Sequence, residues 1–161
     1  MSKKALFLDR DGVINVEKNY LYKVEDFEFI DGIFELCRFF QDKGYIIVVV
    51  TNQSGIARGY YSEEDFEKLT NFMVDKFEKQ NIHVSKVYHC PHHPEITGKC
   101  SCRKPEAGML LEAQKKFNID MKNSIMVGDK QRDVDAGKNA GVGYNYLYEG
   151  SFKEIIDAHS K

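Results

Sequence analysis

The chain has 161 residues, of which 42% are hydrophobic and 30% are charged. This length predicts a single domain over residues 1–161, and the composition is that of a folded globular protein rather than a disordered one. The net charge of −2 argues against nucleic acid as a partner, because proteins that bind polyanions carry a basic excess.

The hydrophobic residues give no sign of a membrane or export segment. The longest apolar run, from Tyr45 to Val50, is far shorter than the roughly 20 residues of a membrane-spanning helix. Residues Met1 to Lys4 lead directly into an apolar run of only four residues, whereas a secretory signal contains about 7–15 apolar residues. We therefore predict a soluble, cytoplasmic protein without a membrane partner, and nothing in the sequence requires more than a monomer.

The predicted elements alternate between short strands and longer helices. Residues 5–8 form the first apolar run, and a helix follows in which apolar residues recur at i, i+3, i+4 and i+7 from Ile33 up to a stop at Gly44. Residues 45–50 have the continuous apolar pattern of a strand buried on both faces. Ser62 precedes acidic residues and is the expected N-cap of a second helix. Further strands are predicted at 84–90, 125–127 and 144–148, and further helices at 107–117 and 134–140.

This alternation predicts an α/β fold with a doubly wound, mostly parallel, Rossmann-like sheet. Ligands of such sheets bind beyond the carboxyl ends of the strands. Four segments directly follow predicted strands, and each contains side chains that are polar or able to bind metal: residues 9–12, 51–55, 90–93 and 128–130. We therefore expect a functional site at this edge of the sheet.

Acidic residues dominate two of these strand ends. In an extended segment Asp9 and Asp11 point to one side and Arg10 points away, and Asp129 arrives at the same edge from another strand. Repelling carboxylates are commonly neutralised by a divalent cation, and oxygen donors favour Mg²⁺. Gly12 permits a tight turn and close approach of the backbone to a phosphate.

Two other segments supply groups that bind anions. Thr51 begins a polar turn, 51–55, whose hydroxyl and backbone N–H groups can form an anion-binding nest. Arg103 and Lys104 precede a helix and supply positive charge that can neutralise a phosphate.

These motifs, in this order, resemble those of the haloacid dehalogenase superfamily. The matching stretches are residues 9–15, 51–53, 104–105 and 128–133, so that the resemblance covers the chain from residue 5 to about 148. Within the superfamily, residues 26–32, 49–59 and 90–94 are similar to the family of D-glycero-D-manno-heptose 1,7-bisphosphate 7-phosphatases. Histidinol-phosphate phosphatases share the motifs and the cysteine loop, and they are the alternative.

The resemblance implies a phosphomonoesterase with a two-step mechanism. Asp9 is implied as the nucleophile that forms an aspartyl-phosphate, and Asp11 as the acid and base that serves the leaving group and then water. Thr51 and Lys104 are implied to hold the phosphoryl oxygens. The family binds Mg²⁺ through the side chains that match Asp9 and Asp129 and through the backbone carbonyl of Asp11. Asp133 is then expected to orient Lys104 or a metal-bound water.

The cysteines predict a second metal site. Cys37 lies on the apolar stripe of the first helix and is an expected core residue, but Cys90, His92, Cys100 and Cys102 fall within a 13-residue loop, 90–102. Three thiols and an imidazole suit a structural, tetrahedral Zn²⁺ site, and the alternative, a disulfide, is disfavoured in the cytoplasm.

The residues alone leave three histidines as the fourth zinc ligand: His89, His92 and His93. The resemblance implies His92.

The segments between the motifs have room for one helix and one strand each, besides the zinc loop, and so leave no space for a separate cap domain. We therefore expect an open active site, rimmed by residues 17–20, 56–61 and the zinc loop. The substrate-binding residues expected at this rim are Glu17, Lys18, Asn19, Tyr20, Asn52, Gln53, Ser54, Arg103 and Lys130.

The favoured function is thus an Mg²⁺-dependent phosphatase of a small sugar bisphosphate. A non-catalytic phospho-receiver shares the sheet and the strand-end aspartate, but it has no use for the acid and base that Asp11 supplies. A nucleic-acid 3′-phosphatase is disfavoured by the net charge of −2 and by the lack of a basic stripe.

Overall fold

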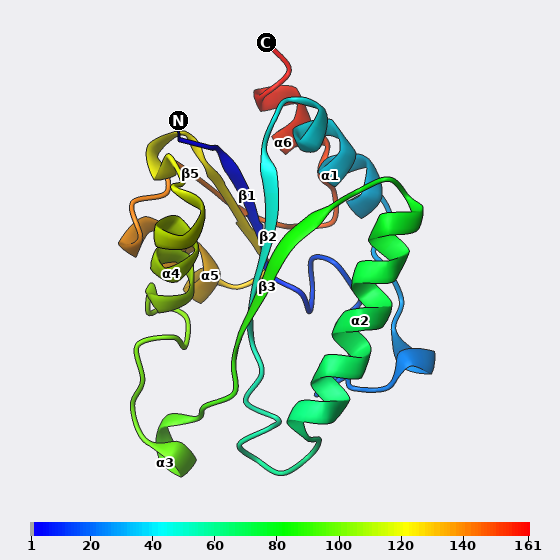
Figure 1. The fold of residues 1–161 in the computed structure, drawn as a ribbon, viewed down its shortest axis with the longest axis vertical. Helices are drawn as coiled ribbons and strands as arrows, with labels where there is room; N and C mark the ends of the chain where they lie inside the picture. The colour runs from blue at the N-terminus through cyan, green and yellow to red at the C-terminus, as the bar shows by residue number, and fades with distance from the viewer. Residues whose placement is uncertain (1) are drawn as a thin grey trace.

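The computed structural model describes residues 2–161; Met1, with which the predicted domain begins, lies outside them. The described residues form one five-stranded sheet with the strand order β3–β2–β1–β4–β5 (Figure 1). All neighbouring strands are parallel, which confirms the doubly wound α/β class. The strands are β1 (Ala5–Leu8), β2 (Ile46–Asn52), β3 (Val84–Cys90), β4 (Ile125–Gly128) and β5 (Tyr144–Leu147).

Helices cover both faces of the sheet. One face packs against α1 (Ile33–Asp42), α2 (Glu63–Lys79) and α6 (Lys153–Ala158), and the other against α4 (Gly108–Phe117) and α5 (Gln131–Asn139) (Figure 1). The short helix α3 (Pro94–Thr97) lies apart from these layers, in the loop after β3. Single 3₁₀ turns occupy Val24–Asp26 and Met121–Asn123.

The core is divided by the sheet because successive strand residues point to opposite faces. In β1, Leu6 and Leu8 pack with the α1 and α2 side, whereas Ala5 and Phe7 pack with the α4 and α5 side. All four are fully buried. The central strand therefore reads as a continuous apolar run, and its end can present polar groups only beyond Leu8.

Most predicted elements are present, with shifted ends. Helix α2 starts after Ser62, whose side chain and that of Asp65 each accept a hydrogen bond from the other's backbone N–H. Gly44 follows the end of α1 at φ +90°, as a stop signal requires. Strand β2 runs two residues further than predicted, and α5 begins three residues earlier. Helix α6 was not predicted, because its six residues are too few to establish a periodicity.

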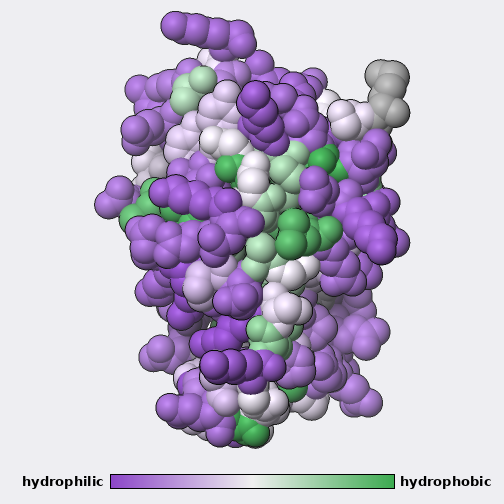
Figure 2. Space-filling view, turned by 90° about the vertical axis from the view of Figure 1, so that its left-hand side faces the viewer, coloured by the Kyte–Doolittle hydropathy of each residue, from purple (hydrophilic) through white to green (hydrophobic). Residues whose placement is uncertain are grey.

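Polar side chains dominate the face of the molecule that carries α4 and α5. Figure 2, which faces the side with α4 and α5, shows a mainly hydrophilic surface with a few hydrophobic side chains near its middle. Among residues 2–161, none of the helices combines the length and the apolar composition needed to cross a bilayer.

Candidate active site

The polar strand ends meet at the carboxyl edge of the sheet. Asp9 directly follows β1, Thr51 and Asn52 end β2, and Asp129 directly follows β4. Parallel strands present their carboxyl ends together, so side chains that are far apart in the sequence become neighbours here. Cys90, at the end of β3, belongs to a separate cluster.

Lys104 reaches this edge from a loop and is 2% exposed. Its Nζ lies 2.9 Å from Asp9 Oδ1 and 2.7 Å from Asp133 Oδ1, and it donates to the carbonyl oxygen of Val50 at 2.8 Å. Although burial lowers the pKa of Lys104, the two carboxylates raise it above its usual value, so the ammonium stays charged. Lys104 thus donates two hydrogen bonds, to Asp9 and to Val50, and forms an ion pair with each of the two carboxylates.

Asn52 fixes the backbone of Lys104. Its Oδ1 accepts a hydrogen bond from the Lys104 N–H at 2.9 Å, and its Nδ2 donates to the Lys104 carbonyl oxygen at 3.2 Å. These two bonds tie the loop that carries the lysine to the end of β2.

Three carboxylates form the base of the site. Oxygen atoms of Asp9, Asp129 and Asp133 all lie within 4.8 Å of one another. Gly12, at φ +92°, makes this possible, since a Cβ on it would lie 2.0 Å from Asp129 Oδ2. Gly128 leaves similar room for Asp133, whose Oδ2 accepts the Lys130 N–H at 3.0 Å and so also caps α5.

This cluster fits Mg²⁺ by the chemistry of its donors. Burial raises the pKa of Asp9 well above its usual value, with Lys104 opposing and Asp133 reinforcing the rise. Burial likewise raises the pKa of Asp129. Holding such hard oxygen donors together is costly without a counter-charge, and a small divalent cation supplies one.

The expectation that Arg10 points away from Asp11 is wrong. After β1 the chain is not extended, because the N–H groups of Val13, Ile14 and Asn15 all turn toward the Arg10 carbonyl oxygen. The guanidinium, 1% exposed, donates to Asp11 Oδ1 from Nε and Nη2 at 3.2 and 3.1 Å.

Two amides add further donors to the same carboxylate. Asn15 Nδ2 donates to Asp11 Oδ1 at 3.0 Å, and Gln53 Nε2 donates to Asp11 Oδ2 at 3.0 Å. Asp11 is therefore held apart from the carboxylate cluster, and its side chain is not a member of it in the described residues.

Two adjoining cavities open from the base. The inner cavity, about 50 Å³, is lined by Asp9, Asp11, Glu17, Asn52, Lys104, Asp129, Lys130, Arg132 and Asp133. The outer cavity, about 360 Å³, shares five of these residues and is lined by Asp11, Glu17, Asn19, Tyr20, Asn52, Gln53, Ser54, Gly55, Arg58, Tyr61, Arg103, Lys130 and Arg132. Four cationic side chains therefore line the outer cavity, which adjoins the inner cavity that contains Asp9.

Most expected substrate-binding residues line the outer cavity, with one exception. Lys18 does not line it, because its Nζ pairs with Glu28 at 3.3 Å. Thr51 lines neither cavity; it is 1% exposed, and its Oγ1 accepts from Gln53 Nε2 at 2.9 Å.

Sequence reasoning missed two cations of this cavity. Arg58 lies in the expected rim and Arg132 in the motif at 128–133, but neither was given a role. The Arg58 guanidinium lies 5.6 Å from the centre of the Tyr20 ring. The Tyr20 ring in turn packs edge-on against the Tyr60 ring, with 4.8 Å between the two ring centres. The available signal was position: both arginines follow a strand end within a few residues.

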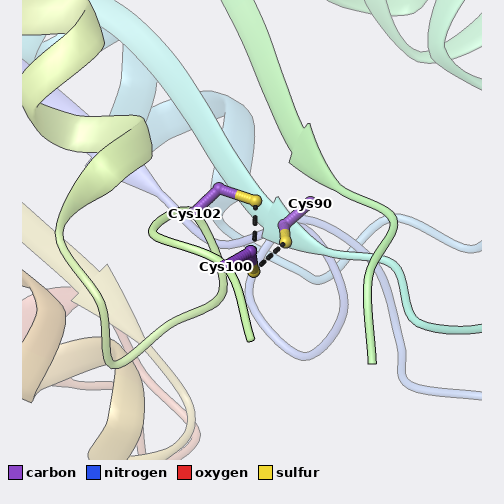
Figure 3. Close-up of side chains that lie close together, drawn as sticks. All are labelled: Cys90, Cys100 and Cys102. Carbon is purple, nitrogen blue, oxygen red and sulfur yellow. Dashed lines mark hydrogen bonds between the residues drawn. The ribbon is translucent and has the colours of Figure 1, made fainter. Parts of the chain in front are cut away.

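The three loop cysteines come together as predicted. Sγ of Cys100 lies 3.6 Å from Sγ of both Cys90 and Cys102 (Figure 3). Partial burial raises the pKa of Cys100, but backbone N–H groups of Arg103 and Cys102 outweigh it and lower the pKa below its usual value. Tetrahedral zinc with Zn–S bonds near 2.3 Å places its sulfurs about 3.8 Å apart, so the spacing fits Zn²⁺.

The histidines near the loop differ in their contacts. His89 Nε2 lies 2.7 Å from Glu63 Oε1, and its ring stacks on Phe66. His93 Nδ1 accepts the Glu95 N–H at 3.2 Å and caps α3. In the part of the chain that the structure describes, the His92 ring is not part of the sulfur cluster.

Known proteins resemble the chain over nearly its whole length. A family model described as HAD-hydrolase-like matches residues 101–154. A D-glycero-alpha-D-manno-heptose-1,7-bisphosphate 7-phosphatase of Campylobacter jejuni is 58% identical, over 96% of this chain and 87% of the relative. The corresponding beta-anomer phosphatase of Haemophilus ducreyi is 49% identical, over 88% of this chain and 81% of the relative.

A solved structure shares the fold. The D,D-heptose 1,7-bisphosphate phosphatase from B. bronchiseptica, crystallised with magnesium and phosphate, superposes with a TM-score of 0.82 at 29% identity and covers 96% of this chain and 86% of its own. Fold, site and sequence agree with one another. The chain therefore belongs to the haloacid dehalogenase-like hydrolases and, within them, to the family of heptose-1,7-bisphosphate 7-phosphatases.

Proposed function

We propose that the protein removes the 7-phosphate of D-glycero-D-manno-heptose 1,7-bisphosphate by transferring it to Asp9 and then to water. The observation that carries the proposal is the arrangement of the two cavities. A carboxylate paired with a buried lysine lies at the narrow base, and a wider space lined by four cationic side chains opens above it. A substrate with phosphates at both ends matches this arrangement.

Asp9 is the proposed nucleophile. Its carboxylate is almost buried, at 7% exposure, and faces the inner cavity, so an entering phosphate meets it end-on with little competing water. Burial favours the neutral form of Asp9, and pairing with Lys104 opposes this effect in favour of the ionised form that attack on phosphorus requires. The product of this step is an aspartyl-phosphate, which is hydrolysed in the second step.

Asp11 is the proposed general acid and base. It lines both cavities and therefore borders the path along which the sugar oxygen leaves. Protonation of that oxygen converts an alkoxide into an alcohol, and the resulting carboxylate then takes a proton from the attacking water. The charge of Lys104, which lines the inner cavity, is proposed to stabilise the phosphoryl oxygens between these steps, whereas Thr51 would need to become accessible to contribute its hydroxyl.

Mg²⁺ is the proposed cofactor, and the relative from B. bronchiseptica was crystallised with this ion. Asp9 and Asp129, with the Asp11 carbonyl oxygen, are the residues that would hold it. When bound, the ion would neutralise part of the negative charge shared by the carboxylates and the phosphate.

The second phosphate of the substrate is the proposed partner of the outer cations. Arg103, Lys130, Arg58 and Arg132 line this cavity, and relatives of this chain are named as bisphosphate phosphatases. The Arg103 guanidinium also donates to the His92 carbonyl oxygen at 3.3 Å, which links its position to the cysteine loop.

We further propose that the loop binds structural Zn²⁺ through Cys90, Cys100, Cys102 and His92. The sulfur spacing supports the three thiolates, and the other contacts of His89 and His93 favour His92 as the imidazole ligand. The four cysteines of the chain are free, which accords with a reducing compartment such as the cytoplasm.

The proposal is tested by phosphate release from a panel of substrates at equal concentration. The panel contains both anomers of the heptose bisphosphate, histidinol phosphate, a hexose 6-phosphate and a DNA end with a 3′-phosphate. We expect the highest kcat/KM on a heptose bisphosphate and no release by Asp9→Asn. Preference for histidinol phosphate or for the DNA end would contradict the assignment.

A further inference from the structure

Gln53 lies at the centre of a buried polar network beside the proposed general acid. It follows β2, and only 2% of its surface is exposed. Its Nε2 donates to Asp11 Oδ2 at 3.0 Å and to Thr51 Oγ1 at 2.9 Å. Its Oε1 accepts from the Tyr61 hydroxyl and from Arg10 Nη2, the latter at 3.4 Å.

These partners determine which way the amide points. Turning it over would place Oε1 against the Asp11 carboxylate and the NH₂ group against the Arg10 guanidinium, so that acceptor would face acceptor and donor would face donor. The observed orientation is therefore the one that satisfies both charged neighbours. Tyr61 adds a second partner to the oxygen.

The contacts also use the full hydrogen-bonding capacity of the amide. A glutamine side chain has two N–H donors and two lone pairs on its oxygen, and here each has a protein partner. A substrate hydroxyl could bind Gln53 only by displacing one of them. Although Gln53 borders the outer cavity, it is poorly suited to be a substrate ligand.

We propose that Gln53 is a positioning residue, which holds Asp11 at the distance and angle needed to protonate the leaving oxygen. The inference rests on the proposed function, since it takes Asp11 as the general acid. The same amide also orients Thr51, because Thr51 Oγ1 accepts a hydrogen bond from Gln53 Nε2 at 2.9 Å.

The test compares two substrates that differ mainly in their leaving group. Phenyl phosphate needs protonation of its leaving oxygen, whereas p-nitrophenyl phosphate, of nearly the same shape, needs little. The measured quantity is kcat/KM, which reports the steps up to departure of the alcohol. Gln53→Met keeps the length of the side chain and removes its hydrogen bonds. Asp11→Asn is the reference for loss of the acid.

We expect Gln53→Met to lower kcat/KM by about 10–100-fold on phenyl phosphate and by less than about 3-fold on p-nitrophenyl phosphate. The larger loss is expected because a misplacement of a catalytic group near 1 Å costs up to about 10²-fold in rate. Gln41→Met is the matched control. Gln41 also makes two hydrogen bonds, to the Asn81 carbonyl oxygen and the His83 N–H, but it lies outside both cavities. We expect it to change thermal stability without changing the ratio of the two rates.

The outcomes separate the inference from the proposed function. Asp11→Asn is expected to lower kcat/KM more on phenyl phosphate than on p-nitrophenyl phosphate. If it does so and Gln53→Met lowers kcat/KM on both substrates equally, Gln53 does not position the acid, and the inference fails while the proposed function stands. If Asp11→Asn itself shows no such dependence, its role as acid fails, and the inference with it. Should Gln53→Met fold poorly, Tyr61→Phe replaces it. We expect Tyr61→Phe to lower kcat/KM several-fold on phenyl phosphate only. An equal change of kcat/KM on the two substrates would overturn the inference.

Discussion

Replacing Lys104 by methionine tests the electrostatic design of the site most directly. The change keeps the length and apolar stem of the side chain but removes an ammonium that has three partners at 2.7–2.9 Å. The carboxylates of Asp9 and Asp133, 7% and 1% exposed, are then left buried without a cation between them.

The expected loss of stability is large for a single substitution. Removing one partner of a buried ion pair costs about 3–5 kcal/mol, because the remaining charge stays desolvated. For a chain of this length, 1 kcal/mol corresponds to roughly 2–4 °C in melting temperature, so Lys104→Met should melt roughly 6–20 °C below the parent protein. Turnover should fall by about 10²–10³-fold, the usual cost of removing one preorganised charge from a transition state.

The assay is thermal unfolding followed by circular dichroism, alongside phosphate release at saturating Mg²⁺. Lys130→Met is the control, because Lys130 is an exposed cation of the same cavities whose ammonium forms no ion pair with a carboxylate of the described residues. We expect it to change the melting temperature by little. An unchanged melting temperature for Lys104→Met would refute the reasoning, since it would mean that the carboxylates do not need the ammonium.

Four further predictions follow from the geometry. Gly12→Ala should weaken Mg²⁺ binding, measured by calorimetry, and cost about 1–3 kcal/mol in stability, because the residue has φ +92° and its new Cβ would meet the Asp129 carboxylate; unchanged affinity would contradict this. Burial raises the pKa of Asp9 and Asp129. The metal-free fold should therefore lose stability as the pH rises from about 4 through the raised pKa values, because the buried carboxylates then ionise. Since Mg²⁺ binds the ionised carboxylates, it should raise the melting temperature more at pH 8 than at about pH 5. Arg103→Ala should raise KM for the bisphosphate by about 10–100-fold, the worth of a charged hydrogen bond, and leave p-nitrophenyl phosphate unaffected; equal effects on both substrates would rule out a contact to the second phosphate. Cys100→Ser should release zinc, by metal analysis, and lower kcat/KM for the bisphosphate more than for p-nitrophenyl phosphate, whereas a zinc-free protein with unchanged kinetics would deprive the loop of its proposed role.

The sequence predicts the sheet and the positions of the strand-end residues well, for a physical reason. A strand buried on both faces must be apolar along its whole length, so the first polar residue after it, such as Asp9 after Leu8, marks where the strand reaches the surface. Parallel strands then bring these points to one edge. The period of the pattern and the place where it stops are both local properties, and both can be read from the sequence.

Contacts made by long side chains could not be predicted in the same way. Arg10 was placed by assuming an extended backbone, but the turn that follows β1 brings its guanidinium onto Asp11. Arg58 and Arg132 reach the outer cavity through flexible side chains, whose direction depends on partners such as Tyr20. Lys18 was expected to bind substrate at the rim, but its side chain does not line the outer cavity and pairs instead with the carboxylate of Glu28.

Charge is distributed unevenly between the base of the site and the outer cavity. At the base, the cluster of one ammonium and three carboxylates has an excess of about two negative charges, which matches a divalent cation. Lys130 and Arg132 border both cavities and lie on the outer side of this cluster. The outer cavity has the opposite excess, because four cationic side chains border it together with the carboxylates of Asp11 and Glu17, and Arg10 neutralises the first of these. On the proposed function, we expect the outer cavity to attract a bisphosphate and the transferable phosphate to approach Asp9 only when a cation is present. We therefore expect phosphate binding to depend on metal binding through the charge of the carboxylate cluster.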